Sequence, residues 1–198
     1  MSLSISENIK KIKDSTPESV CLVAVSKTKP IEDIKKAYDA GQRIFGENKV
    51  QELREKYPSL PKDIEWHMIG HMQTNKVKYI APFVSLIHGV ESLKLLKEIN
   101  KQALKNERVI KILLQFHIAT ESTKFGLQLN EAKEILDSDE FKKLKNVEVS
   151  GVMGMASFVE NESQVRLEFA TLKSIFEELK SNYFSSTDSF KIVSMGMS

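Results

Sequence analysis

The stretch that decides the fold is Cys21-Leu22-Val23-Ala24-Val25-Ser26-Lys27-Thr28-Lys29-Pro30, in which an apolar run ends at a lysine and a helical pattern follows. A continuous apolar run of this length is typical of a strand buried on both faces of a parallel sheet. Because desolvating an unpaired ammonium is costly, Lys27 indicates that this strand opens onto a polar pocket. A loop lysine whose ammonium lies in water is the simpler interpretation of the position by itself.

The same strand–helix pattern recurs along the chain. The runs that predict strands are Cys21–Val25, Ile44–Phe45, His67–Ile69, Leu86–Val90, Ile110–Phe116, Val147–Val152 and Lys191–Ser194. Stretches with helical periodicity separate these runs, and a stripe at Ile5, Ile9 and Ile12 adds a leading helix. This alternation predicts an α/β fold with a parallel sheet, either an open doubly wound sheet or a barrel. No G-x-G-x-x-G motif follows the first run, which disfavours a dinucleotide-binding sheet.

The number of units favours an incomplete barrel. Seven strand–helix units are one fewer than the eight of a TIM-type (β/α)8 barrel, which typically takes about 250 residues. The chain has 198 residues and stops directly after the seventh run. We therefore expect an α/β TIM-type (β/α)8 barrel with an extra N-terminal helix, whose eighth strand is missing from this sequence. The native polypeptide would then continue past Ser198 by one further unit of about 25–35 residues.

Composition bounds the class of protein. Of the residues, 41% are hydrophobic and 28% are charged, and no Gly/Ser-rich linker divides the chain, so we expect a single globular domain over residues 1–198. The formal net charge of +2 is too small to argue for nucleic acid. No apolar run approaches the roughly 18 residues that span a bilayer, and the first residues lack a signal-peptide pattern. One cysteine, Cys21, excludes an internal disulfide and fits a reducing cytoplasm.

Polar and glycine-containing clusters follow the predicted strands, at the end where barrels build their active sites. Simpler interpretations exist for their members. Asn48 and Asn75 can cap helices, and His67, in an apolar strand, can be a hydrogen-bonded core histidine. The four histidines lie on three different strands without an H-E-x-x-H spacing, which disfavours a metal site. No G-x-S-x-G motif occurs, which disfavours a serine hydrolase.

Six blocks, in order and over nearly the whole chain, resemble the pyridoxal phosphate homeostasis proteins. The blocks are Val25-Ser26-Lys27-Thr28; Gly46-Glu47-Asn48 with Val50-Gln51-Glu52; Trp66-His67 with Ile69-Gly70, Gln73 and Asn75-Lys76; Lys124-x-Gly126; Gly151-x-Met153-x-Met155; and Ser194-Met195-Gly196-Met197-Ser198. The resemblance implies a fold like the N-terminal barrel of alanine racemase. It also implies that pyridoxal 5′-phosphate (PLP) is held as a Schiff base on Lys27.

The resemblance implies the remainder of a cofactor site as well. Asn48 would lie beside the cofactor, and His67 would project from the third strand near its ring. Met195, Gly196 and Ser198 would form one side of the phosphate cradle, through backbone N–H groups and the Ser198 hydroxyl. In the family a glycine- and arginine-containing block on the eighth strand completes the site, and this sequence lacks that block.

We therefore expect a PLP-binding protein that buffers and carries the cofactor in intracellular PLP homeostasis, without strong catalytic activity. Its partners would be PLP, free amino acids and PLP-dependent apoenzymes, without nucleic acid or membrane, and the chain would be a monomer or a weak homodimer. The alternative is a PLP-dependent amino-acid racemase, an isomerase that needs acid–base groups on both faces of the ring. A third interpretation is a barrel for another phosphorylated metabolite, with Lys27 as a charge partner only.

Overall fold

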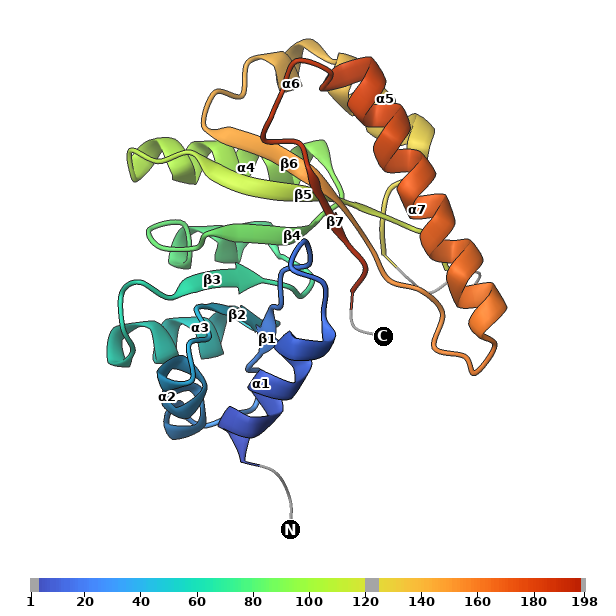
Figure 1. Cartoon of the computed structure of the whole chain (residues 1–198). Coiled ribbons are helices and arrows are strands. Elements are labelled where there is room, and N and C mark those ends of the chain that lie inside the picture. Colours follow the sequence, from blue (N-terminus) through green and yellow to red (C-terminus); the bar gives the residue numbers. More distant parts are fainter. Residues whose placement is uncertain (1–3, 120–124, 197–198) are drawn as a thin grey trace.

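A single parallel sheet organises the computed structural model, which describes residues 4–119 and 125–196. Its strands are β1 (Ala24–Val25), β2 (Ile44–Glu47), β3 (Glu65–Met68), β4 (Leu86–Val90), β5 (Ile110–Phe116), β6 (Val147–Gly154) and β7 (Ile192–Ser194). Each strand pairs in parallel with the next one along the chain, so the order in the sheet is the order in the sequence. The sheet curls, with helices on its outside (Figure 1). The predicted barrel-type arrangement is confirmed, with seven strands in the described residues.

Helices connect the strands, and the predicted leading helix is present. The helical elements are α1 (Ile5–Ser15), α2 (Ile31–Asp39), α3 (Val50–Lys56), the 3-10 helices Tyr57–Ser59 and Thr74–Tyr79, α4 (Leu93–Lys105), α5 (Leu129–Asp137), α6 (Asp139–Lys142) and α7 (Glu162–Tyr183). Local capping fixes several of the starts. Ser4 and Glu7 form a capping box at α1, and the Ser92 hydroxyl accepts the Leu95 N–H at α4. In the described residues, no helix combines the length and apolarity that crossing a bilayer requires.

Two apolar layers lie on opposite faces of the sheet. The larger one lies between sheet and helices and contains Phe45, Trp66 and Ile87, all essentially inaccessible to solvent. A smaller cluster joins Leu86, Leu113 and Met153, with Ile192 against it. Successive side chains of a strand point to opposite faces, and the strand neighbours of these four belong to the larger layer. The smaller cluster therefore lies on the inner face of the curled sheet.

Some boundaries differ from the sequence-based expectation. The first strand covers only Ala24–Val25 of the run Cys21–Val25, because pairing with β2 begins at Ala24 and Cys21 is exposed. The capping interpretation of two asparagines is wrong. Lys49 precedes α3 as its N-cap, and Gln73 holds that position for Thr74–Tyr79, so neither Asn48 nor Asn75 caps a helix.

Candidate functional site

The parallel sheet brings most of the predicted site residues to one edge. Lys27 follows β1, Asn48 follows β2, and Met195 and Gly196 follow β7, while His67 lies within β3. Because the carboxyl ends of parallel strands meet at the same edge, these residues share the rim where barrels of this type place their sites. Ser198, the remaining predicted member, lies outside the described residues.

Lys27 lies in a tight turn. The Lys29 N–H donates to the Ser26 carbonyl oxygen at 3.0 Å, so Lys27 and Thr28 are the two central residues of a β-turn. Thr28 has φ 62°, a left-handed conformation that costs a β-branched residue about 1–3 kcal/mol. Positive φ at the second central position is the type II pattern, in which glycine or asparagine is usual. The turn leaves Lys27 half-buried, which disfavours the interpretation of a lysine extended into water.

A buried ion cluster of Lys56, Glu47 and Glu52 contacts both neighbours of Lys27. The Lys56 ammonium donates to Glu47 Oε1 at 2.7 Å, to Glu52 Oε2 at 2.8 Å and to the Ser26 carbonyl oxygen at 2.8 Å. The Ser26 hydroxyl donates to Glu47 Oε1 at 2.7 Å, and the Thr28 N–H donates to Glu52 Oε2 at 2.7 Å. The ion cluster thus fixes the residues on either side of the lysine.

The charges within the ion cluster support one another. Lys56 is 7% exposed and Glu47 is fully buried. Burial opposes the charge on Lys56, but the hydrogen bonds to Glu47 and Glu52 outweigh it and raise the lysine pKa. The hydrogen bond from Lys56, followed by that from the Thr28 N–H, lowers the pKa of Glu52. Sequence reasoning placed Glu47 and Glu52 in a family block but missed Lys56, whose only signal is a lysine four residues after Glu52 on α3.

Three strands contribute a hydrogen-bonded chain on the inner face of the sheet. His88 Nε2 lies 3.1 Å from His67 Nδ1, and His88 Nδ1 lies 3.1 Å from the Ser194 hydroxyl. Burial lowers the pKa of His67 to about 4. Burial, and then the proximity of His67, lowers the pKa of His88 to about 3. Both rings are therefore neutral at pH 7, and His67 is a hydrogen-bonded histidine that also lies at the predicted site.

Asn48 carries an unused acceptor at the rim. Its side-chain oxygen is buried and has no hydrogen-bond partner among the described residues. A Cβ built at Gly70 would lie 2.4 Å from the Asn48 carbonyl oxygen, so only glycine allows this close approach of the segments that follow β2 and β3. Buried polar atoms normally find a partner, so the Asn48 oxygen has an unused capacity to accept a hydrogen bond. Across the part of the chain described, no three His, Cys, Asp or Glu side chains gather as a metal ion requires.

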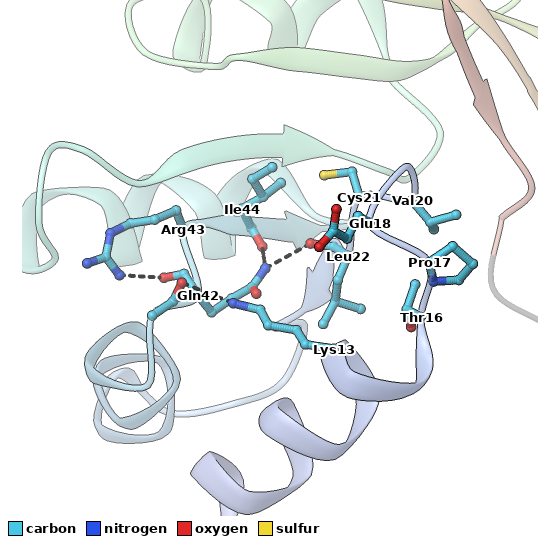
Figure 2. A pocket seen from close by; sticks show the side chains of 11 residues that line it. Lys13, Thr16, Pro17, Glu18, Val20, Cys21, Leu22, Gln42, Arg43 and Ile44 are labelled. Atoms are coloured by element: carbon cyan, nitrogen blue, oxygen red, sulfur yellow. Dashed lines mark hydrogen bonds between the residues drawn. The ribbon is translucent and has the colours of Figure 1, made fainter.

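A cavity of about 330 Å³ lies at the opposite end of the sheet (Figure 2). Its lining includes Lys13, Cys21, Gly41 and Arg43, which precede β1 and β2 or belong to α1. The Lys13 ammonium donates to the Gly41 carbonyl oxygen at 3.1 Å and so bridges α1 to the start of β2. The cavity is therefore separate from the rim that carries Lys27.

Comparison with known proteins agrees with this geometry. Residues 3–198 match the alanine racemase N-terminal domain. A pyridoxal phosphate homeostasis protein of Aquifex aeolicus (strain VF5) is 39% identical over 178 residues, which is 89% of this chain and 76% of that protein. Alanine racemase of Clostridium difficile 630 shares only 15% identity over 97% of this chain and 52% of its own, with a TM-score of 0.75, and shows the fold alone.

Solved structures of PipY from Synechococcus elongatus PCC7942 are also similar. The structure without PLP has a TM-score of 0.87 at 31% identity and covers 98% of this chain and 89% of that chain. The structure with PLP bound has a TM-score of 0.80 at 31% identity and covers 89% and 82%. With the fold, the matched domain and the curated relative in agreement, this chain belongs to the alanine racemase N-terminal domain family and, within it, to the pyridoxal phosphate homeostasis proteins.

Proposed function

We propose that this chain binds PLP at the rim, attaches it covalently to Lys27, and buffers and carries it without strong catalytic activity. The observation that carries the proposal is the half-buried Lys27 on a turn whose flanking residues are both fixed. Relatives named for PLP homeostasis, and PipY with PLP bound, support it. The proposal includes a cytoplasmic location, exchange with PLP-dependent apoenzymes and free amino acids, no nucleic acid or membrane partner, and a monomer or weak homodimer.

The residues at the rim fit this cofactor. PLP supplies an aldehyde that condenses with a primary amine, with loss of one water, and it also presents a ring hydroxyl and a phosphate dianion. Lys27 provides the amine. The buried Asn48 side-chain oxygen lacks a described partner and can accept from the ligand. Met195 and Gly196 can offer backbone N–H groups to an anion, and the left-handed φ of 70° at Gly196 allows the chain to curve there.

His67 would contribute a neutral ring beside the cofactor. With a pKa of about 4 it carries no charge at pH 7, and its Nδ1 is already bound to His88. His67 therefore orients and packs rather than exchanging protons at physiological pH.

Lys27→Ala tests the proposed attachment. PLP added to the wild-type chain should give near-visible absorbance, and borohydride should fix the label on Lys27 through hydride addition to the new carbon–nitrogen double bond. Lys27→Ala should lose the label, because the half-buried amine that the turn presents is then gone. Lys29→Ala, which alters an exposed lysine of the same turn, is the matched control and should keep it. Peptide mapping that places the label on Lys29, Lys49 or Lys124 would refute the assignment.

A further inference from the structure

We propose that the ion cluster of Lys56, Glu47 and Glu52 is a positioning device for Lys27, and that Lys56 sets the reactivity of that lysine by holding the turn of residues 26–29. This inference rests on the proposed function and assigns a role to three residues outside the cofactor contacts. None of the three needs to touch PLP. Their effect would pass entirely through the backbone of Ser26 and Thr28.

The geometry shows how the ion cluster reaches the turn. The Ser26 carbonyl oxygen accepts both the Lys29 N–H that closes the turn and the Lys56 ammonium. Glu52 accepts the N–H of Thr28 at 2.7 Å. The Lys56 ammonium therefore binds the first residue of the turn directly and the third residue through Glu52. Lys27 lies between these two fixed points.

Thr28 has a strained backbone conformation that the ion cluster can stabilise. A threonine with φ 62° is strained, and strained backbone persists only where surrounding contacts over-determine it. The contact that Glu52 makes to the Thr28 N–H is specific to this conformation of the turn. If the contact is lost, the turn can relax towards a negative φ at Thr28 and carry Lys27 away from its position at the end of β1. Without the strain, the contacts of Lys56 would matter only for stability.

The ion cluster lies on the helix side of the sheet. Glu47 lies two residues after Phe45, which belongs to the layer between sheet and helices, so its side chain points to the same face, towards α3. Its neighbour Asn48 belongs to the rim, and the hydroxyl of Ser26, the first residue of the turn, donates to Glu47. A change at Lys56 can therefore alter the lysine of the site without removing any group that would contact the cofactor.

The experiment combines Lys56→Met with Thr28→Gly. In the wild-type background, Lys56→Met should weaken covalent attachment of PLP to Lys27 about tenfold. Glycine adopts positive φ without strain, so in the Thr28→Gly background Lys56→Met should weaken attachment less than about threefold. Lys56→Arg, which keeps a buried donor, should fall between wild type and Lys56→Met. Lys62→Met is the matched control, because Lys62 donates to the Tyr57 carbonyl oxygen on the exposed surface, and attachment should be unchanged.

A second measurement uses the chain without cofactor. Amide hydrogen exchange at Thr28 should accelerate about tenfold in Lys56→Met, because the N–H loses a fixed acceptor when Glu52 is released. If Lys56→Met alone does not fold, Glu47→Gln/Lys56→Met removes both buried charges, and we expect it to fold with the same loss of attachment. Circular dichroism and urea unfolding establish that each variant is folded before attachment is measured.

The outcomes separate the two proposals. If the wild-type chain takes no PLP onto Lys27, the proposed function fails, and the exchange rate of Thr28 alone decides whether the ion cluster holds the turn. If wild type is labelled and a folded Lys56→Met is labelled equally well, the positioning role is overturned. An equal loss in the wild-type and Thr28→Gly backgrounds also overturns it, because Lys56 would then not act through the turn.

Discussion

At the scale of single residues, polar side chains decide what the rim can do. Lys27 is presented by a turn that a threonine closes in a strained conformation, and Asn48 keeps a buried oxygen without a described partner. His67 and His88 bind one another instead of remaining available as bases. Each of these costs stability, and proteins retain such features mainly at functional sites.

The histidine pair predicts a pH-dependent stability. Both pKa values, about 4 and about 3, lie below the ordinary value of 6.5. Between pH 6.5 and about 4 the unfolded chain therefore binds more protons, so the unfolding free energy falls as the pH falls, by roughly 1.4 kcal/mol per pH unit for each histidine. His88→Gln should flatten this slope in urea unfolding measured from pH 4.5 to 7.

Gln51→Ala is the control for that series, because Gln51 is exposed and has no titratable group, so the slope should stay that of wild type. A His88→Gln slope as steep as that of wild type would show that the buried pair does not control acid sensitivity.

At the scale of elements, the approach of β6 to β7 positions the last segment of the rim. Gly151 pairs with Ile192, and the same register carries Met153 opposite Ser194. A Cβ built at Gly151 would lie 1.9 Å from the Ile192 carbonyl oxygen. Glycine is therefore required for these strands to approach, and β7 in turn places Ser194 against His88.

Gly151→Ala should displace β7 and lower the unfolding free energy by at least about 2–3 kcal/mol, as overpacking of a buried contact does. Because Met195 and Gly196 follow β7, PLP attachment should weaken as well. Urea unfolding and PLP titration measure the two effects. Ser150→Ala, one residue earlier, removes a side-chain hydrogen bond to Glu148 and should cost no more than about 1 kcal/mol. Equal stability of wild type and Gly151→Ala would contradict the close approach.

At the scale of the whole molecule, the curled sheet has two separate ends. The rim with Lys27 lies at the carboxyl ends of the strands, and the cavity beside Lys13 lies at the amino ends of β1 and β2. The fold is that of an amino-acid racemase domain, but fold and activity are separate properties. Whether the rim only holds PLP, as proposed, or also racemises amino acids depends on its proton-transfer groups.

We expect little turnover of amino acids. Proton transfer at an α-carbon needs a positioned acid and base, and His67, with a pKa of about 4, is a weak base at pH 7. The PLP-loaded chain incubated with L-alanine in deuterated water should therefore exchange the Cα proton no faster than free PLP does. Nuclear magnetic resonance measures this exchange. Exchange or racemisation well above free PLP would favour the racemase alternative.

The fold followed from local patterns to a large extent. Apolar runs alternating with helical stripes predicted the parallel strands, the leading helix and the position of Lys27 at a strand end. They could do so because the buried face of a strand or helix repeats apolar residues at a characteristic spacing. Boundaries were less well determined. The run Cys21–Val25 contains only two paired residues, because pairing depends on the neighbouring strand and not on apolarity alone.

The sequence by itself determined the barrel-type sheet, the lysine that follows its first strand and the family blocks around it. Only the tertiary structure decided which distant polar groups meet. Lys56 reaches Ser26 across 30 residues, and His88 reaches Ser194 across 106. Sequence periodicity cannot predict either contact, because each depends on the register between strands and on the helix that covers them. Hydrogen bonds between such groups are also stronger in the folded interior than in water, because the local dielectric constant is lower there.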